Sequence, residues 1–199
     1  MSTSRHHTPA SPAATPRLKP PPWYARLILA LQRRKYGTEL ESAMLWARLP
    51  RAFLALTLHY RSLDRRGSPL EPGLRALVQV RVSQINWWAF CVDLNGAAAL
   101  ERAVAPDKLA ALPDYARSGL YSDREKAALA YAEAVTDSTR HVDEPMRQAL
   151  RSHFGEQVII ELTALIAFQN MSSKFNAALG VPSQGFCAPP SSPPDGEHR

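Results

Sequence analysis

The chain has 199 residues, of which 45% are hydrophobic and 21% charged, so it suits one domain with a hydrophobic core rather than a disordered chain. Its net charge is +6, but residues 1–36 hold seven basic residues and no acidic one, and the rest of the chain therefore sums to −1. This neutral body does not favour nucleic-acid binding, and no apolar run reaches the roughly 18 residues that a membrane span needs.

Both ends of the chain are rich in proline. Six prolines fall within residues 1–22 and five within residues 182–199. Such segments bury too little apolar surface to order themselves. We therefore expect disordered tails at 1–22 and 188–199, on either side of a single domain that spans 23–187.

The first half of the domain predicts three helices. A basic amphipathic helix covers 23–35 and is ended by Gly37. A second begins at Pro50, where proline suits the first helical turn. Segment 72–85 alternates in part like a strand, but its apolar residues also fit one helical face. Its length, without a turn signal inside it, favours a helix.

The second half continues the helical pattern. Asn86 is a suitable N-cap for the next helix. Residues 122–125 read Ser-Asp-Arg-Glu, a capping box that opens an alanine-rich helix. Asp143 begins another helix, and the last covers 156–179. Six or more helices with no hairpin signal predict an all-α bundle.

The most informative motif lies at residues 86–95. Cys91 follows Trp88 by three residues and precedes Asn95 by four, so the three positions share one helical face. With a cysteine at Trp88 and a histidine at Asn95, the segment would read C-x-x-C-x-x-x-H. That pattern is a pair of thiols with its own base, and the thiolate is the form that attacks peroxides and disulfides.

The chain resembles the carboxymuconolactone decarboxylase / alkylhydroperoxidase D family over about residues 45–187. The resemblance is carried in order by segments 74–78, 82–86, 89–93, 125–136 and 161–176. It implies the alkylhydroperoxidase D-like helical bundle, assembled into a homo-oligomer.

The resemblance also implies which residues would form the peroxidase relay. The family's attacking cysteine matches Cys91, whereas its resolving cysteine falls on Trp88, its histidine on Asn95 and its glutamate on Ala76. Three of four relay groups are therefore absent. We expect a peroxidase-type antioxidant by descent, an oxidoreductase with a degenerate active site whose activity is residual or lost.

Other residues near the motif are candidates for a pocket or a second thiol. Trp88 is placed to cover the Cys91 sulfur, and a nearby Asp93 would raise the thiol pKa. Lys174, with Asn170 and Asn176 on the last helix, is a candidate for the pocket wall.

The second cysteine, Cys187, lies just beyond the last helix and is a candidate resolving thiol for Cys91, within one chain or between chains. Two cysteines so far apart form no secreted disulfide framework, so we expect a cytoplasmic protein. No histidine spacing predicts a metal site, and no motif predicts a cofactor.

Two alternatives to the redox function stay open. One is a non-catalytic binding or scaffold protein whose ligand is a small molecule. The other is a lyase or isomerase that acts on a cyclic carboxylate, with Lys174 or an arginine as the partner of the anion. The expected partners are thus a second copy of the chain and either a peroxide or an aromatic or carboxylate ligand.

Overall fold

The computed structural model describes residues 20–187, and within this range the chain is helical without a strand, which confirms the predicted all-α class. The predicted tails at 1–22 and 188–199 lie outside the described residues, apart from residues 20–22. The helices are α1 (Trp23–Tyr36), α2 (Glu41–Trp46), α3 (Pro50–Leu63), α4 (Pro72–Ile85), α5 (Ala89–Glu101), α6 (Pro106–Ala110), the 3-10 turn η1 (Leu112–Asp114), α7 (Asp123–Thr136), α8 (Glu144–His153) and α9 (Glu156–Ala178).

Local signals set most of these boundaries. Gly37 ends α1 with φ of 74°, a left-handed conformation that glycine adopts without a Cβ penalty. The capping box at Ser122 and Glu125 opens α7 as predicted, and the Asp143 side chain accepts a hydrogen bond from the backbone of α8. The short helices α2 and α6 were not predicted, because five or six residues are too few to show a hydrophobic period.

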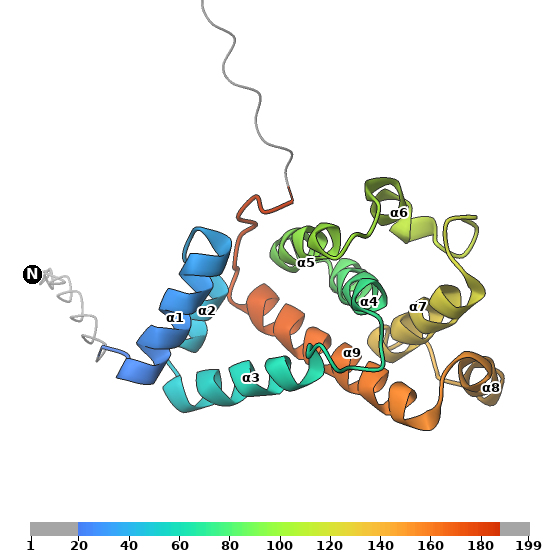
Figure 1. Cartoon of the computed structure of the whole chain (residues 1–199), viewed down its shortest axis with the longest axis horizontal. Coiled ribbons are helices and arrows are strands. Elements are labelled where there is room, and N and C mark those ends of the chain that lie inside the picture. Colours follow the sequence, from blue (N-terminus) through green and yellow to red (C-terminus); the bar gives the residue numbers. More distant parts are fainter. Residues whose placement is uncertain (1–19, 188–199) are drawn as a thin grey trace, which may run out of the picture.

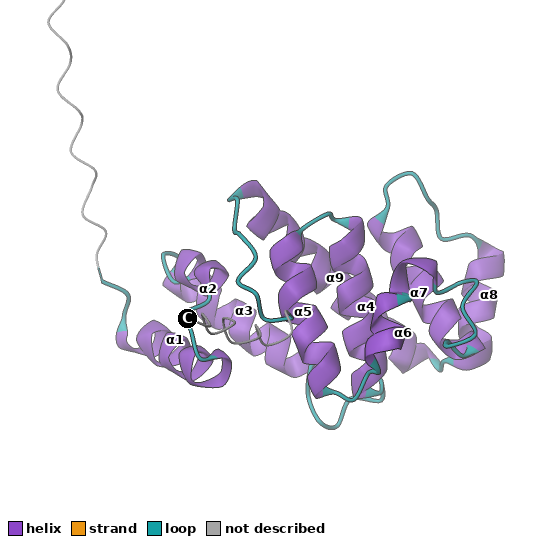
Figure 2. Ribbon diagram, turned by 90° about the horizontal axis from the view of Figure 1, so that it is seen from above, coloured by secondary structure: helices purple, strands orange, loops and turns teal. Residues whose placement is uncertain are grey.

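Helix α4 lies at the centre of the larger part of the molecule. It packs against α5, α7 and α9, and α8 closes the far end beside α7 (Figures 1 and 2). Side chains from all sides of α4 are buried, which accounts for its ambiguous period in the sequence. The main core gathers here and includes Ala76, Val78, Leu129, Leu162 and Ile166.

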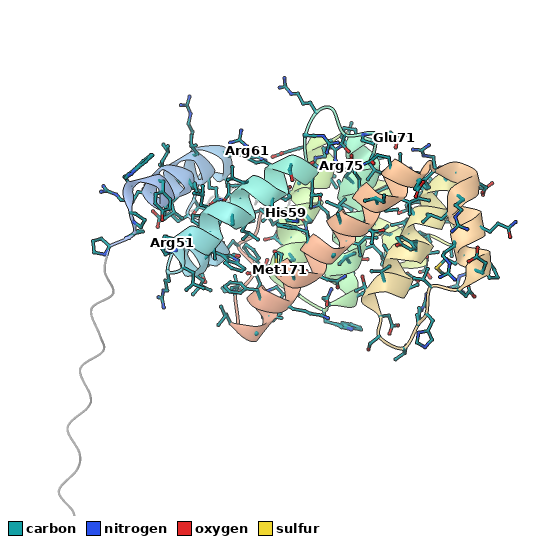
Figure 3. The ribbon with its side chains drawn as sticks, turned by 90° about the horizontal axis from the view of Figure 1, so that it is seen from below. Arg51, His59, Arg61, Glu71, Arg75 and Met171 are labelled. Carbon is teal, nitrogen blue, oxygen red and sulfur yellow. The ribbon has the colours of Figure 1, made fainter. Side chains whose placement is uncertain are left out.

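A second, smaller part is built from α1, α2 and α3. Ala25, Ala43 and Phe53 form its buried centre. Figure 3 shows α3 and α9 on one face of the molecule, with His59 labelled on α3 and Met171 on α9. The space between this part and α5 holds the candidate site described below.

The chain after α9 runs back between α2 and α5 (Figure 1). We call residues 181–187 the C-terminal strap. The Gln184 side chain accepts a hydrogen bond from the backbone of Glu41 at 3.1 Å and donates one to the carbonyl of Glu39 at 2.9 Å. The strap thus ties the start of α2 to the bundle.

The junction between α4 and α5 differs from the prediction. Asn86 does not cap α5, because it ends α4 and donates its side-chain N–H to Val82 O at 2.9 Å. Trp87 follows in a left-handed conformation with φ of 53°, and Trp88 is the N-cap residue. Cys91 therefore lies in the first turn of α5, where the helix dipole favours negative charge.

No helix of residues 20–187 is long and apolar enough to cross a membrane.

Candidate functional site

A cavity of about 160 Å³ lies between α5, α9 and the small part formed by α1, α2 and α3. Much of its wall is aromatic, and among residues 20–187 the only charged side chains that line it belong to Lys35 and Arg102. The aromatic residues are Tyr36, Trp46, Phe53, Tyr60, Phe90 and Phe168.

One face of α5 forms the floor of this cavity. Cys91, Asn95, Ala98 and Arg102 all line it, and their spacing of four, three and four residues repeats once per helical turn. The thiol lies in the first turn and the guanidinium belongs to the residue after the last turn. A ligand in the cavity would therefore meet a thiol near one end of α5 and a cation near the other.

The Cys91 thiol is surrounded by neutral groups. Its residue is only 3% exposed, and Asn176 Nδ2 donates a hydrogen bond to Sγ at 3.3 Å. The Ser42 hydroxyl donates to Asn176 Oδ1 at 2.6 Å, which orients the amide with its N–H groups toward the sulfur. Burial raises the pKa of Cys91, and the hydrogen bonds from Asn176 and Ser173 offset only part of that rise.

Asn95, which stands where the family has its histidine, is bonded to α4 and not to the Cys91 thiol. Its Nδ2 donates to Ser83 Oγ at 3.0 Å, and Gln169 Nε2 donates to the same oxygen at 3.1 Å. Ser83 in turn donates to the carbonyl of Gln79, and Gln169 also donates to Ser173. This polar seam joins α4, α5 and α9 beneath the cavity, so the Asn95 amide serves to hold the helices together.

Charged groups gather at the other end of the cavity. Arg102 Nη2 lies 2.5 Å from Asp64 Oδ2, and Arg75 Nε lies 3.1 Å from Asp64 Oδ1. The Tyr60 hydroxyl also donates to Asp64, at 3.1 Å. Burial and the nearby carboxylate of Asp64 raise the pKa of Tyr60 to about 12, so this phenol is neutral at physiological pH.

Several of the candidate pocket residues lie elsewhere. Trp88 is half-buried and packs with the cluster of Phe90, Cys91 and Val181, but it does not line the cavity. Lys174 is exposed, because it falls on the outward side of α9. The neighbouring Asn170 bonds to Asn86 and Thr136 instead, and of the three candidates on α9 only Asn176 reaches the cavity.

Asp93 also points away from the cavity, into the C-terminal strap. Its carboxylate accepts hydrogen bonds from Ser183 Oγ at 2.9 Å, from Gln184 N at 3.1 Å and from Cys187 N at 2.6 Å. Burial opposes its ionisation, but backbone N–H groups of Cys187 and Phe186 outweigh that effect and lower the pKa of Asp93. Asp93 therefore acts on Cys187 and not, as expected, on Cys91.

The candidate pair of thiols is separated by α5. Cys187 Sγ lies 2.9 Å from the position that a Cβ on Gly96 would occupy. At about 100° per residue, Asp93 and Gly96 lie on the side of the helix opposite Cys91. Both thiols are free, and a disulfide within one chain would require the strap to leave α5.

The cavity offers Cys91 no imidazole or carboxylate base from residues 20–187. His59 is exposed on α3 (Figure 3), with its ring 5.6 Å from that of Phe168 on α9, and does not line the cavity. Ala76, where the resemblance places a relay glutamate, is buried in the main core. In the same range, no three His, Cys, Asp or Glu side chains come close enough to hold a metal ion.

Several cavity residues escaped the sequence analysis. Arg102 lies eleven residues after Cys91, and extending the spacing of the motif by two more turns would have found it. The side chains from α1, α2 and α3 gave no such signal, because their approach to α5 depends on the packing of distant segments.

Comparison with known proteins gives relatives of the whole domain. The chain is 40% identical over 173 residues to the uncharacterized protein YnjA of Escherichia coli K12. The matched segment covers 87% of this chain and 91% of YnjA. An uncharacterized peroxidase-related protein from Silicibacter sp. TM1040 superposes with a TM-score of 0.77 at 23% identity, over 92% of this chain and 98% of that one.

A third similar structure is the debrominase Bmp8, with a TM-score of 0.75 at 20% identity over 83% of this chain and 88% of Bmp8. A cysteine-to-alanine form of Bmp8 has also been solved in complex with 2,3,4-tribromopyrrole. At these identities the two structures establish the shared fold alone.

Residues 50–134, from the start of α3 into α7, match the carboxymuconolactone decarboxylase family. The chain therefore belongs to the carboxymuconolactone decarboxylase family and has the alkylhydroperoxidase D-like fold.

Proposed function

We propose that this protein binds a small ring-shaped organic molecule in the cavity, in contact with the protonated thiol of Cys91. The observation that carries the proposal is the aromatic wall around a thiol whose partners are all neutral. A buried apolar cavity of about 150 Å³ is large enough to bind benzene. The present cavity, at about 160 Å³, thus suits a molecule of one ring.

The environment of Cys91 argues against efficient peroxide reduction. A peroxidase needs the thiolate, and burial raises the pKa of this thiol. A base would offset that effect, but the cavity wall offers no imidazole or carboxylate among the described residues. Asn95 replaces the expected histidine and is committed to Ser83. The complex of Bmp8 with a brominated pyrrole gives an analogy for a ring-shaped ligand in this fold.

The binding proposal is tested by filling the cavity. Ala98 lies on the cavity floor, so Ala98→Phe would occupy the space where a ligand binds. Ala89→Phe is the matched control, because Ala89 is exposed on the same helix. With a panel of small aromatic compounds, we expect thermal shifts for the wild type and Ala89→Phe but none for Ala98→Phe. A folded Ala98→Phe protein that binds the same compounds equally well would contradict the proposal.

A second candidate is a slow thiol peroxidase that depends on an external reductant. It is favoured by the position of Sγ on the cavity wall and by the hydrogen bond that Asn176 donates to it. The Cys91 thiolate would take one oxygen from a peroxide, leaving an alcohol or water and a sulfenic acid. Two external thiols would then reduce the sulfenic acid and leave as a disulfide and water.

This second candidate is tested by peroxide consumption in the presence of a thiol reductant. Wild type and Cys91→Ser are compared, with Cys187→Ser as the control for the other thiol. A rate that falls only in Cys91→Ser supports the peroxidase, whereas equal rates in all three proteins contradict it. For the lyase or isomerase alternative, the expected anion partner is Lys174 or an arginine. Lys174 lies outside the cavity, whereas Arg102 lines it.

We also propose that the protein forms a homo-oligomer. Trp23, Leu27 and Leu31 are spaced by four residues on α1 and are each more than half exposed. A second copy would cover this apolar stripe. Light scattering after size exclusion tests the proposal, and a monomer at high protein concentration would contradict it.

A cytoplasmic location, which would keep both thiols reduced, stays a prediction from the cysteine content.

A further inference from the structure

The end of the cavity beside Arg102 carries an unbalanced positive charge. Arg75 and Arg102 both pair with the single carboxylate of Asp64, and the side chains of the three residues are at most 18% exposed. Neither arginine has another acidic partner among the described residues. Two guanidinium groups and one carboxylate leave a net charge of +1 in a largely buried place, which is costly without a counter-charge.

In the hydrogen-bond network of this cluster, one guanidinium nitrogen has N–H donors without an acceptor. The carboxylate of Asp64 already accepts hydrogen bonds from Arg75 and Arg102 on different oxygens, and it accepts a third from the Tyr60 hydroxyl. Arg75 also donates to the carbonyl of Leu70. Arg102 Nη1, by contrast, is buried and has no hydrogen-bond partner among residues 20–187. A guanidinium group presents several N–H donors in a fixed fork, which suits a planar anion.

The surroundings favour the cavity over the second hollow that Arg102 borders. That hollow is also lined by Glu71 and Glu125 and by their ion-pair partners Arg124 and Lys108, so an anion bound there would lie among carboxylates. In the cavity beside Cys91, no carboxylate of the described part of the chain lines the wall. Its other cation, Lys35, is exposed and lies on α1, far along the chain from Arg102.

We propose that Arg102 selects ligands with an anionic group, such as a carboxylate, and binds that group while the ring lies toward Cys91. This inference rests on the proposed binding function, because it names the class of ligand for the same cavity. Arg102 is a specificity-determining residue in this proposal, and the Tyr60 hydroxyl, whose proton is donated to Asp64, lines the cavity with it.

The test compares two probes of the same shape, benzoate and benzamide, by calorimetry with the wild-type protein. Benzoate is ionised at about pH 7, whereas benzamide is neutral. We expect benzoate to bind about tenfold more tightly. High salt should weaken the binding of benzoate and leave the affinity for benzamide unchanged, because salt screens the attraction between benzoate and the guanidinium group. Equal affinities of the wild type for the two probes would overturn the inference without touching the binding proposal.

Variants then assign the preference to one cation. Arg102→Gln should bring the two affinities together, Arg102→Lys should keep part of the preference, and Lys35→Gln should keep all of it. A preference that survives in folded Arg102→Gln protein would overturn the role of Arg102. If Arg102→Gln does not fold, the wild-type ratio and its salt dependence still decide the inference. If neither probe binds at any concentration tested, the binding function fails together with the anion site.

Discussion

One cysteine lies at each of two opposite faces of α5: Cys91, which belongs to the helix, and Cys187, which belongs to the C-terminal strap. On the cavity face, the Cys91 sulfur meets the neutral amide of Asn176 and an aromatic wall. On the other face, Cys187 lies against Gly96 and beside the carboxylate of Asp93. The carboxylate beside a cysteine thus lies on the face that holds the strap, whereas the thiol on the cavity face has no base next to it. A helix that matches the family at Cys91 therefore need not carry the chemistry of the family.

The largest effect is expected where the cavity face joins the other helices. Ser83→Ala removes the fully buried hydroxyl that accepts hydrogen bonds from the side-chain amides of Asn95 and Gln169. Both amides then lose that acceptor. We expect a loss of about 2–3 kcal/mol in the free energy of unfolding, measured by urea denaturation. Ser152→Ala is the matched control, since that exposed hydroxyl bonds only to its own helix, and it should change the stability by less than about 0.5 kcal/mol. Similar losses in both variants would refute the importance of the seam.

The next effect concerns the opposite face. Asp93→Ala removes the acceptor of two backbone N–H groups and one hydroxyl of the strap, and we expect a loss of about 2 kcal/mol. Asp93→Asn keeps one acceptor oxygen and should lose about half as much. Hydrogen exchange should show the loss of protection at Gln184 and Cys187. Unchanged protection there would mean that the strap is held by packing alone.

A smaller effect is expected at Gly96. In a helix interior, Gly→Ala should stabilise by about 1 kcal/mol, but here the new Cβ would lie 2.9 Å from Cys187 Sγ. We expect Gly96→Ala alone to give little or no gain. The same change in a Cys187→Ala background should recover the gain, because the sulfur is gone. A double-mutant cycle by chemical denaturation measures the coupling, and strict additivity would show that the sulfur does not oppose the Cβ.

The smallest effect is one of pH. Burial raises the pKa of Cys91, and burial together with Asp93 raises the pKa of Cys187, so both thiols should react slowly with iodoacetamide at neutral pH. Asp93→Asn should lower the pKa of Cys187 and leave that of Cys91 unchanged. Rates from peptide mass spectrometry across a pH series check both statements. Equal shifts at the two cysteines would show that the faces are not electrostatically separate.

The same thiol pKa values set the sign of a stability change. A thiol whose pKa is raised by folding keeps its proton longer in the native state. Its contribution to stability is complete at lower pH and is lost as the pH rises beyond the ordinary thiol value of 9.0. Alkaline destabilisation should therefore diminish in Cys91→Ala, and an identical pH profile would contradict the burial effect.

The helices were predictable because their signals are local. Gly37, Pro50 and the capping box at Ser122 mark boundaries within a few residues of themselves, and α4 and α9 follow the expected ranges closely. The junction at Asn86 was missed because the left-handed Trp87 shifts the start of α5 by two residues. A non-glycine residue in that conformation has no sequence signature.

The sequence alone determined the family, the all-α class and the absence of three relay groups, since these depend only on which residue stands at which position. It also determined that Cys91 and Asn95 share a helical face. The tertiary structure decided which groups each of them meets: Asn176 for the thiol, Ser83 for the amide, and the far side of α5 for Asp93 and Cys187. Those pairs join residues that are distant in the chain, and only the packing of whole helices brings them within hydrogen-bonding distance.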